Sequence, residues 1–169
     1  MHELILGGAR SGKSALALRR AADSGLAVTW LATAQALDPE MAERIARHRA
    51  ERPAGWRTVE EPLRLAAALR HAAGADAFVV VDCLTLWLTN LLLADDAALL
   101  QAEIAALFAA LPELPGHVIL VANEVGLGIV PDNALARHFR DEAGRLNQTL
   151  AALCDRVTFV AAGLPLALK

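Results

Sequence analysis

Short apolar runs alternate with longer amphipathic stretches along most of the 169-residue chain. The runs are mostly continuous, which is typical of strands covered on both faces in a parallel sheet. They lie at residues 4–6, 28–32, 78–81, 118–122 and 157–160. The segments between them have a helical period. The pattern predicts an α/β fold in which one open, mainly parallel sheet carries helices on both faces, with residues 1–169 forming a single domain.

Two further stretches extend this prediction. Residues 163–169 predict a turn followed by a last edge strand, which we expect to run antiparallel. Residues 77–94 are almost entirely apolar, but Asp82 lies inside them, and a charged residue in a membrane-spanning helix is costly. We therefore predict a buried strand followed by a helix, and no membrane span.

The first strand leads into Gly7-Gly8-Ala9-Arg10-Ser11-Gly12-Lys13-Ser14, which matches the phosphate-binding pattern G-x-x-x-x-G-K-[ST] at every fixed position. Glycines let backbone N–H groups turn toward phosphate oxygens, and the helix that follows presents its positive end to an anion. The pattern assigns Lys13 to the β- and γ-phosphates and the Ser14 hydroxyl to Mg²⁺. The motif predicts binding of a nucleoside triphosphate with magnesium on a three-layer, RecA-like fold of the P-loop NTPase type.

The apolar run at 78–81 ends in Asp82. In P-loop proteins an aspartate at such a strand end lies near the phosphate loop and holds Mg²⁺, directly or through water. An apolar run followed by aspartate is common, so this prediction depends on the phosphate loop. We expect Ser14 and Asp82 to be the metal-binding residues.

A helix is predicted from about residue 39 to residue 52, with Asp38 as its N-cap and Pro39 at its first position. One stripe of this helix begins with Met41 and Ile45 and ends with His48 and Arg52, which is unusual for a core face. Two interpretations stay open from spacing alone. Both polar side chains are solvated at the helix end, or His48 faces the nucleotide as a nucleophile or acid–base group.

Two other segments carry candidate binding residues. The pair Glu60 and Glu61 has the chemistry to bind a ribose or base edge, but such pairs are more often simply exposed. The loop at 123–131 follows a strand end and contains Leu127, Ile129 and Val130, which are costly to expose. They suit an apolar substrate surface or a subunit contact.

Composition narrows the class of protein. The net charge of −3 and the sequence pI of about 5.9 argue against a nucleic-acid partner, which usually requires a basic patch. Cys83 and Cys154 form neither a disulfide framework nor a metal-binding spacing, as in proteins of a reducing compartment. The first residues lack the features of a signal peptide, so we expect a cytoplasmic protein.

Taken together, these motifs resemble the bifunctional adenosylcobinamide kinase / adenosylcobinamide-phosphate guanylyltransferase family of cobalamin biosynthesis. The resemblance covers essentially the whole chain, and its most specific parts are His48 at its helical position and the loop at 123–131. It rests on Gly7–Ser14, Ala32–Ala34, Asp38–Met41 with Arg44, Ile45 and His48, Trp56–Glu60, Asp82–Thr85, Asn123–Pro131, and Phe139–Asp141 with Gly144, Asn147 and Gln148.

The resemblance implies two reactions. ATP or GTP phosphorylates adenosylcobinamide, and GTP then transfers GMP to adenosylcobinamide phosphate through a histidine–GMP intermediate, which releases pyrophosphate. It makes His48 and Lys13 the catalytic residues and implies a homotrimer. It also implies nucleotide contacts from the phosphate loop and from Thr33, Ala34, Arg49, Ala50, Glu51, Arg52, Glu60 and Asp82. Two alternatives remain: another small-molecule P-loop kinase without guanylyl transfer, and a nucleotide-switched interaction module.

Overall fold

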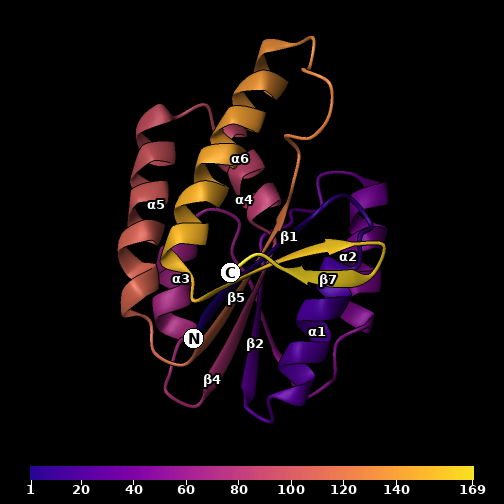
Figure 1. Cartoon of the computed structure of the whole chain (residues 1–169), viewed down its shortest axis with the longest axis vertical. Helices are drawn as coiled ribbons and strands as arrows, with labels where there is room; N and C mark the ends of the chain where they lie inside the picture. The colour runs from indigo at the N-terminus through magenta and orange to yellow at the C-terminus, as the bar shows by residue number, and fades with distance from the viewer.

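A computed structural model describes residues 1–169 and contains one seven-stranded sheet (Figure 1). The strands are β1 (His2–Gly7), β2 (Ala27–Ala32), β3 (Arg57–Glu60), β4 (Ala77–Asp82), β5 (His117–Asn123), β6 (Arg156–Ala161) and β7 (Leu164–Ala167). Their order is β3-β2-β4-β5-β1-β6-β7, and all neighbours are parallel except β6 and β7. The predicted parallel sheet and its antiparallel edge strand are therefore confirmed.

Helices cover both faces of the sheet, which confirms the three-layer arrangement (Figure 1). They are α1 (Lys13–Asp23), α2 (Pro39–Ala50), α3 (Leu65–Ala72), α4 (Leu84–Leu93), α5 (Ala97–Ala110) and α6 (Ala134–Leu153), with a 3₁₀ turn at Leu111–Glu113. On one face, α3 to α6 bury a core cluster of 23 residues against the strands. On the other face, α1 buries a cluster of 12 residues. No helix is long and apolar enough to cross a membrane.

The sequence pattern located most elements but missed some. All five predicted strands lie inside observed ones. The long C-terminal helix α6 follows its N-cap, Asn133, whose side chain accepts the Ala136 N–H at 2.7 Å. Strand β3 was not predicted, because four residues at a sheet edge with a mixed burial pattern carry little periodicity. The region after Asp82 contains α4 and then α5, separated at Asp95 and Asp96.

The strand register brings the functional segments to one edge of the sheet. Gly7 pairs with Asn123, while Ala32 pairs with Asp82 on one side and with Glu60 on the other. These are the carboxyl ends of β1 to β5, where open α/β sheets bind their ligands. Residues far apart in the sequence thus meet because parallel strands end together.

Helix α2 differs from the other helices in having no buried residue. It begins as predicted, with Pro39 at its first position and the Asp38 side chain accepting the Met41 N–H at 2.7 Å. The local sequence therefore forms the helix, and packing contributes little to holding it against the sheet.

Candidate active site

The phosphate loop connects β1 to α1 and has the backbone that its glycines allow. Gly12 caps α1 with φ of 99°, a left-handed conformation that favours glycine. A Cβ at Gly7 would lie 2.3 Å from the Val160 carbonyl oxygen, so no larger residue fits there without a shift. No side chain caps the first turn of α1, so its N–H groups remain available to an anion.

Lys13 is buried at the start of α1 and folds back along the loop. Its Nζ donates to the Gly8 carbonyl oxygen at 2.6 Å and lies 3.4 Å from Ser11 Oγ. Burial lowers the pKa of Lys13, and the nearby Asp82 partly opposes that shift. An ammonium held in this position adds positive charge to the N–H groups of the loop, which suits the β- and γ-phosphates of a nucleotide.

Ser14 and Asp82 face each other below the loop. Ser14 Oγ donates to Asp82 Oδ1 at 3.4 Å, and burial raises the pKa of Asp82, partly offset by His48, Arg52 and Lys13. A nearby cation stabilises the charged form of a carboxyl group whose pKa is raised by burial. A hydroxyl and a carboxylate are the oxygen ligands that Mg²⁺ prefers, and this ion normally takes its remaining ligands from phosphates and water. The donor set therefore fits Mg²⁺, although no cluster of three or more His, Cys, Asp or Glu side chains exists.

His48 lies on the side of α2 that faces the strand ends. Its Nδ1 is 4.0 Å from Asp82 Oδ2, and its side chain is 31% exposed. Met41, Ile45 and Arg52, the other members of the predicted stripe, line the same cavity as His48. The stripe thus faces the phosphate loop, and the arrangement places an imidazole opposite a triphosphate-binding motif.

Arg52 connects the end of α2 to the sheet. Its guanidinium lies 4.9 Å from the centre of the Trp30 ring and donates to Thr58 Oγ1 at 3.3 Å. Trp30 in turn stacks on Trp56, with 6.0 Å between ring centroids. Burial lowers the pKa of Arg52, and Asp82 opposes that shift. The chain just beyond α2 is therefore held by a cation–π contact and a hydrogen bond.

A cavity of about 450 Å³ joins these groups. Of the residues expected at the site, it is lined by Ala9, Arg10, Ser11, Gly12, Lys13, Ser14, Ala34, His48, Glu51, Arg52 and Asp82. Six others do not line it: Gly7, Gly8, Thr33, Arg49, Ala50 and Glu60. Gly7 and Gly8 belong to the loop itself, while Thr33 is buried beneath the cavity. Arg49 Nη1 lies 3.8 Å from Glu60 Oε1, and both side chains are more than 60% exposed.

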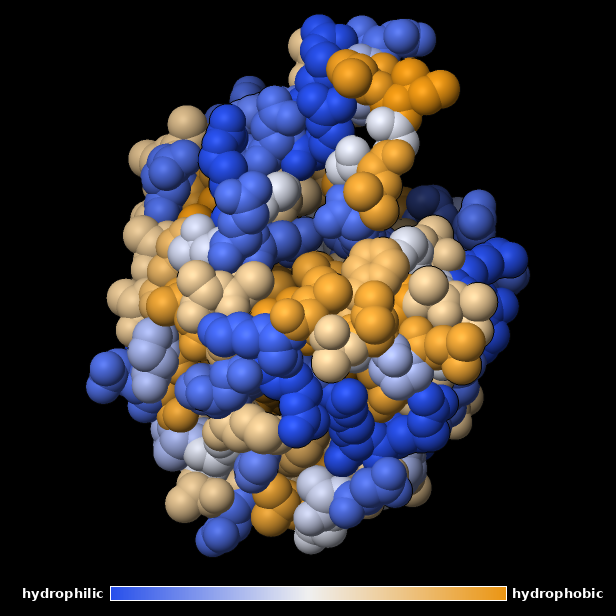
Figure 2. All heavy atoms as spheres, viewed as in Figure 1, coloured by the Kyte–Doolittle hydropathy of each residue, from blue (hydrophilic) through white to orange (hydrophobic).

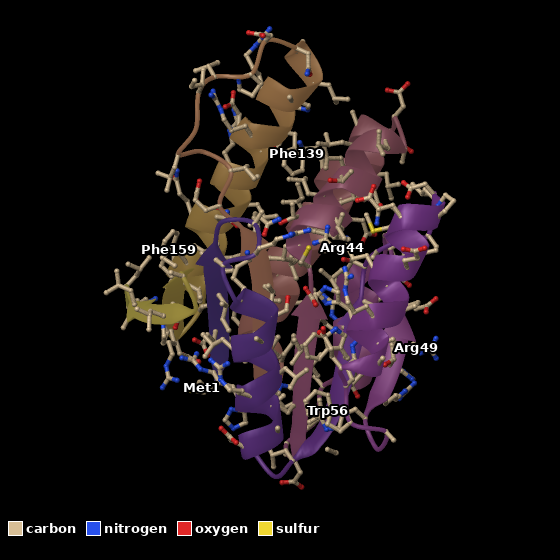
Figure 3. The ribbon with its side chains drawn as sticks, turned by 90° about the vertical axis from the view of Figure 1, so that its right-hand side faces the viewer. Met1, Arg44, Arg49, Trp56, Phe139 and Phe159 are labelled. Carbon is tan, nitrogen blue, oxygen red and sulfur yellow. The ribbon has the colours of Figure 1, made fainter.

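The cavity also contains residues that the site prediction did not include. Arg44 points from α2 into the space beside the phosphate loop, whereas Arg49 points away from it (Figure 3). Arg44 is one of several arginines on α2, together with Arg47 and Arg49, and spacing alone does not separate it from its solvated neighbours. Asn123 and Leu86 also line the cavity. Of these two residues, only Asn123 could be expected at a binding site from the sequence, because it lies at a strand end before a glycine-containing loop.

Apolar side chains are exposed on two surfaces outside the cavity. On the loop between β5 and α6, Leu127 is 83% exposed and Ile129 is 97% exposed. On the edge strand β7 and the residue after it, Leu164, Leu166 and Leu168 are also exposed. Figure 2 shows hydrophobic atoms over β7 near the centre of the molecule and others on the projecting loop. Contiguous exposed apolar patches are uncommon on the surface of a monomeric globular protein.

Comparison with known proteins agrees with this geometry. The family model for cobinamide kinase / cobinamide phosphate guanyltransferase matches residues 3–168. The chain is 63% identical to the bifunctional adenosylcobalamin biosynthesis protein CobP of Pseudomonas aeruginosa, over all of this chain and 98% of the relative. It is 45% identical to the bifunctional adenosylcobalamin biosynthesis protein CobU of Salmonella typhimurium and to that of Escherichia coli, over 98% of both chains in each case.

A solved structure supports the fold at greater distance. The RadB recombinase superposes with a TM-score of 0.55 at 19% identity, covering 94% of this chain and 73% of the other. Similarity at this level shows the RecA-like fold alone. The activity class comes from the family match, which extends over nearly the whole length. The chain belongs to the cobinamide kinase / cobinamide phosphate guanyltransferase family.

Proposed function

We propose that this protein phosphorylates adenosylcobinamide with ATP or GTP and then transfers GMP from GTP to adenosylcobinamide phosphate. The observation that carries the second reaction is the position of His48, which lines the same cavity as the phosphate loop and lies 4.0 Å from Asp82. A P-loop kinase needs no histidine there. A guanylyltransferase that works through a covalent intermediate needs a nucleophile beside the α-phosphate.

In the kinase step, the loop N–H groups and Lys13 bind the phosphates. Ser14 and Asp82 would hold Mg²⁺, which when bound would neutralise charge at the phosphate oxygens. The hydroxyl oxygen of the corrinoid forms a bond to the γ-phosphorus, the bond to the β,γ-bridging oxygen breaks, and the hydroxyl proton is lost to solvent. Lys13 stabilises the charge that develops on the leaving diphosphate.

In the guanylyl step, a neutral imidazole nitrogen of His48 attacks the α-phosphorus of GTP. A nitrogen–phosphorus bond forms, the bond to the α,β-bridging oxygen breaks, and pyrophosphate leaves. A phosphate oxygen of adenosylcobinamide phosphate then attacks the same phosphorus and displaces His48, giving adenosylcobinamide-GDP. Splitting the transfer lets the large second substrate enter after pyrophosphate has gone.

Labelling with GTP tests this assignment directly. GTP carrying ³²P in the α-phosphate is expected to leave acid-labile label on the protein without any corrinoid, and His48→Asn is expected to leave none. His71→Asn is the matched control, because His71 is exposed on α3, over the opposite face of the sheet. Full labelling of the His48 variant would remove its covalent role. If γ-label is transferred to the substrate but the wild-type protein carries no α-label, the protein is a kinase alone. If the protein binds the nucleotide without turnover, it is a nucleotide-switched interaction module.

The proposal includes a homo-oligomer, a trimer by family resemblance, and a cytoplasmic location. The exposed leucines of β7 and the loop at 123–131 support self-association, because such surfaces are stabilised when covered. Light scattering of the purified protein measures the number of subunits. Both cysteines are free thiols, in keeping with a reducing compartment.

A further inference from the structure

Thr33 lies directly beneath the cavity, and its hydroxyl forms both of its hydrogen bonds with a single residue, Cys83. The side chain is 0% exposed. Thr33 Oγ1 donates to the Cys83 carbonyl oxygen at 2.7 Å and accepts the Cys83 N–H at 2.9 Å. One hydroxyl therefore holds both backbone polar groups of the residue that follows Asp82.

The backbone of Thr33 is also fully engaged. Its N–H donates to the Asp82 carbonyl oxygen at 3.3 Å, and its carbonyl oxygen accepts from Asn90 Nδ2 at 2.8 Å. Asn90 is a buried amide on the otherwise mostly leucine-rich α4, and it donates a second hydrogen bond to the Pro62 carbonyl oxygen at 3.1 Å. A buried amide on such a helix is costly unless it is bonded in this way. Thr33 and Asn90 thus join the end of β2, helix α4 and the turn after β3.

We infer that Thr33 is a positioning residue for Asp82. Its hydroxyl fixes the backbone at Asp82 and Cys83, and this holds the Asp82 carboxylate toward Ser14, 3.4 Å away. The family resemblance implies a nucleotide contact at Thr33. Its N–H, carbonyl and hydroxyl are instead all bonded within the protein, while its neighbours Ala32 and Ala34 line the cavity. The inference rests on the proposed magnesium site, because Asp82 is the residue being positioned.

Loss of a group that orients a metal ligand typically lowers the affinity of the site for its metal by about 10- to 100-fold. A change at Thr33 is therefore expected to act on metal binding and to leave the metal-independent contacts of the nucleotide intact. A direct nucleotide contact would show the reverse pattern. Binding measurements with and without magnesium separate these two roles.

The test is Thr33→Val, which keeps the shape of the side chain and removes the hydroxyl. The probe is a fluorescent GDP analogue, whose dissociation constant is measured in excess MgCl₂ and in EDTA. The ratio of the two constants is the gain in affinity due to magnesium. In Thr33→Val this gain is expected to be about tenfold smaller than in the wild-type protein, with the dissociation constant in EDTA unchanged. Thr33→Ser is expected to keep most of the wild-type gain.

Thr158→Val is the matched control. Thr158 is also buried and donates its hydroxyl to Glu3 Oε1 at 2.6 Å, but it lies away from the carboxyl ends of β2 and β4 that carry the site. This variant is expected to lower stability without changing the magnesium-dependent gain. A loss of gain equal to that of Thr33→Val would assign the effect to general destabilisation and overturn the inference.

Other outcomes also decide the question. A Thr33→Val protein with the full magnesium gain, or one weakened equally in EDTA, overturns the positioning role. If that variant does not fold, Thr33→Ala replaces it, because this change also removes the hydroxyl that bonds to Cys83 and introduces no new bulk. The same loss of gain is then expected, and an unchanged gain overturns the inference. A wild-type protein without any magnesium gain would instead remove the proposed metal site.

Discussion

The floor of the active site and helix α2 are held in opposite ways. The floor consists of the phosphate loop, Asp82 and the strand ends, and its Lys13 and Thr33 are buried and hydrogen-bonded. Helix α2 has no buried residue, and polar side chains at and just beyond its end contact the sheet: His48 approaches Asp82, Arg49 approaches Glu60, and Arg52 lies over Trp30. Elements with few buried apolar contacts open at low free-energy cost.

This difference matches the two proposed reactions. In the proposed mechanism, transfer of the γ-phosphate requires the fixed floor, which would hold the phosphates and Mg²⁺ at set positions. Attack on the α-phosphate requires His48, which is carried by the loosely attached helix. We therefore expect damage to the floor to affect both reactions, and damage to α2 to affect mainly the guanylyl step.

The largest effect is expected from Lys13→Ala. Removal of a preorganised cation at the phosphates should lower both the kinase rate and the rate of protein labelling by about 10²–10³-fold. Initial rates with γ- and α-labelled GTP measure the two effects. Arg19→Ala, an exposed cation on the same helix, is the control. If either reaction continued near the wild-type rate, the two would not share this floor.

Arg52→Met is expected to act selectively. It keeps most of the apolar stem and removes the cation–π contact with Trp30, a contact worth about 0.5–2 kcal/mol. His48 labelling should therefore slow by about 2- to 30-fold, with a smaller loss in the kinase rate. Arg47→Met, an exposed position of α2 outside the cavity, is the control. Equal losses in both reactions would indicate that Arg52 serves the nucleotide rather than the helix.

Asp38→Ala tests whether α2 is an independent unit. Loss of the N-cap bond to Met41 should cost the helix about 1 kcal/mol. Amide hydrogen exchange in α2 is then expected to be about fivefold faster, while exchange in β1 and β4 is unchanged. A clear fall in the global melting temperature would show that α2 unfolds together with the core and is not loosely attached to it.

The smallest effect concerns pH and the end of the sheet opposite the site. Burial lowers the pKa of His2, whose Nε2 lies 3.1 Å from the Leu114 carbonyl oxygen. As the pH falls below 6.5, His2 therefore takes up a proton more readily in the unfolded chain than in the folded one. The contribution of His2 to the stability of the fold is complete above that pH and is lost as the solution becomes more acidic. His2→Gln should flatten the stability curve between pH 7 and 5 in urea titrations. An unchanged slope would exclude His2 as its source.

The sequence by itself determined the order and type of most elements. Buried parallel strands are continuous in apolar residues, and caps such as Asp38 and Asn133 are local, so both leave signals that need no tertiary information. The phosphate loop is equally local, because its pattern specifies its own backbone. Strand β3 was missed since its pairing with β2 depends on the rest of the sheet.

Only the tertiary structure decided what lies together at the site. Spacing alone favoured a solvated His48 over one that faces a nucleotide, and it did not distinguish Arg44 from the other arginines of α2. The orientation of α2 over the strand ends separates them, because it turns one stripe of the helix toward the cavity. Thr33 shows the same limit: its hydroxyl bonds to Cys83, 50 residues later in the chain, and that contact follows from strand register rather than local sequence.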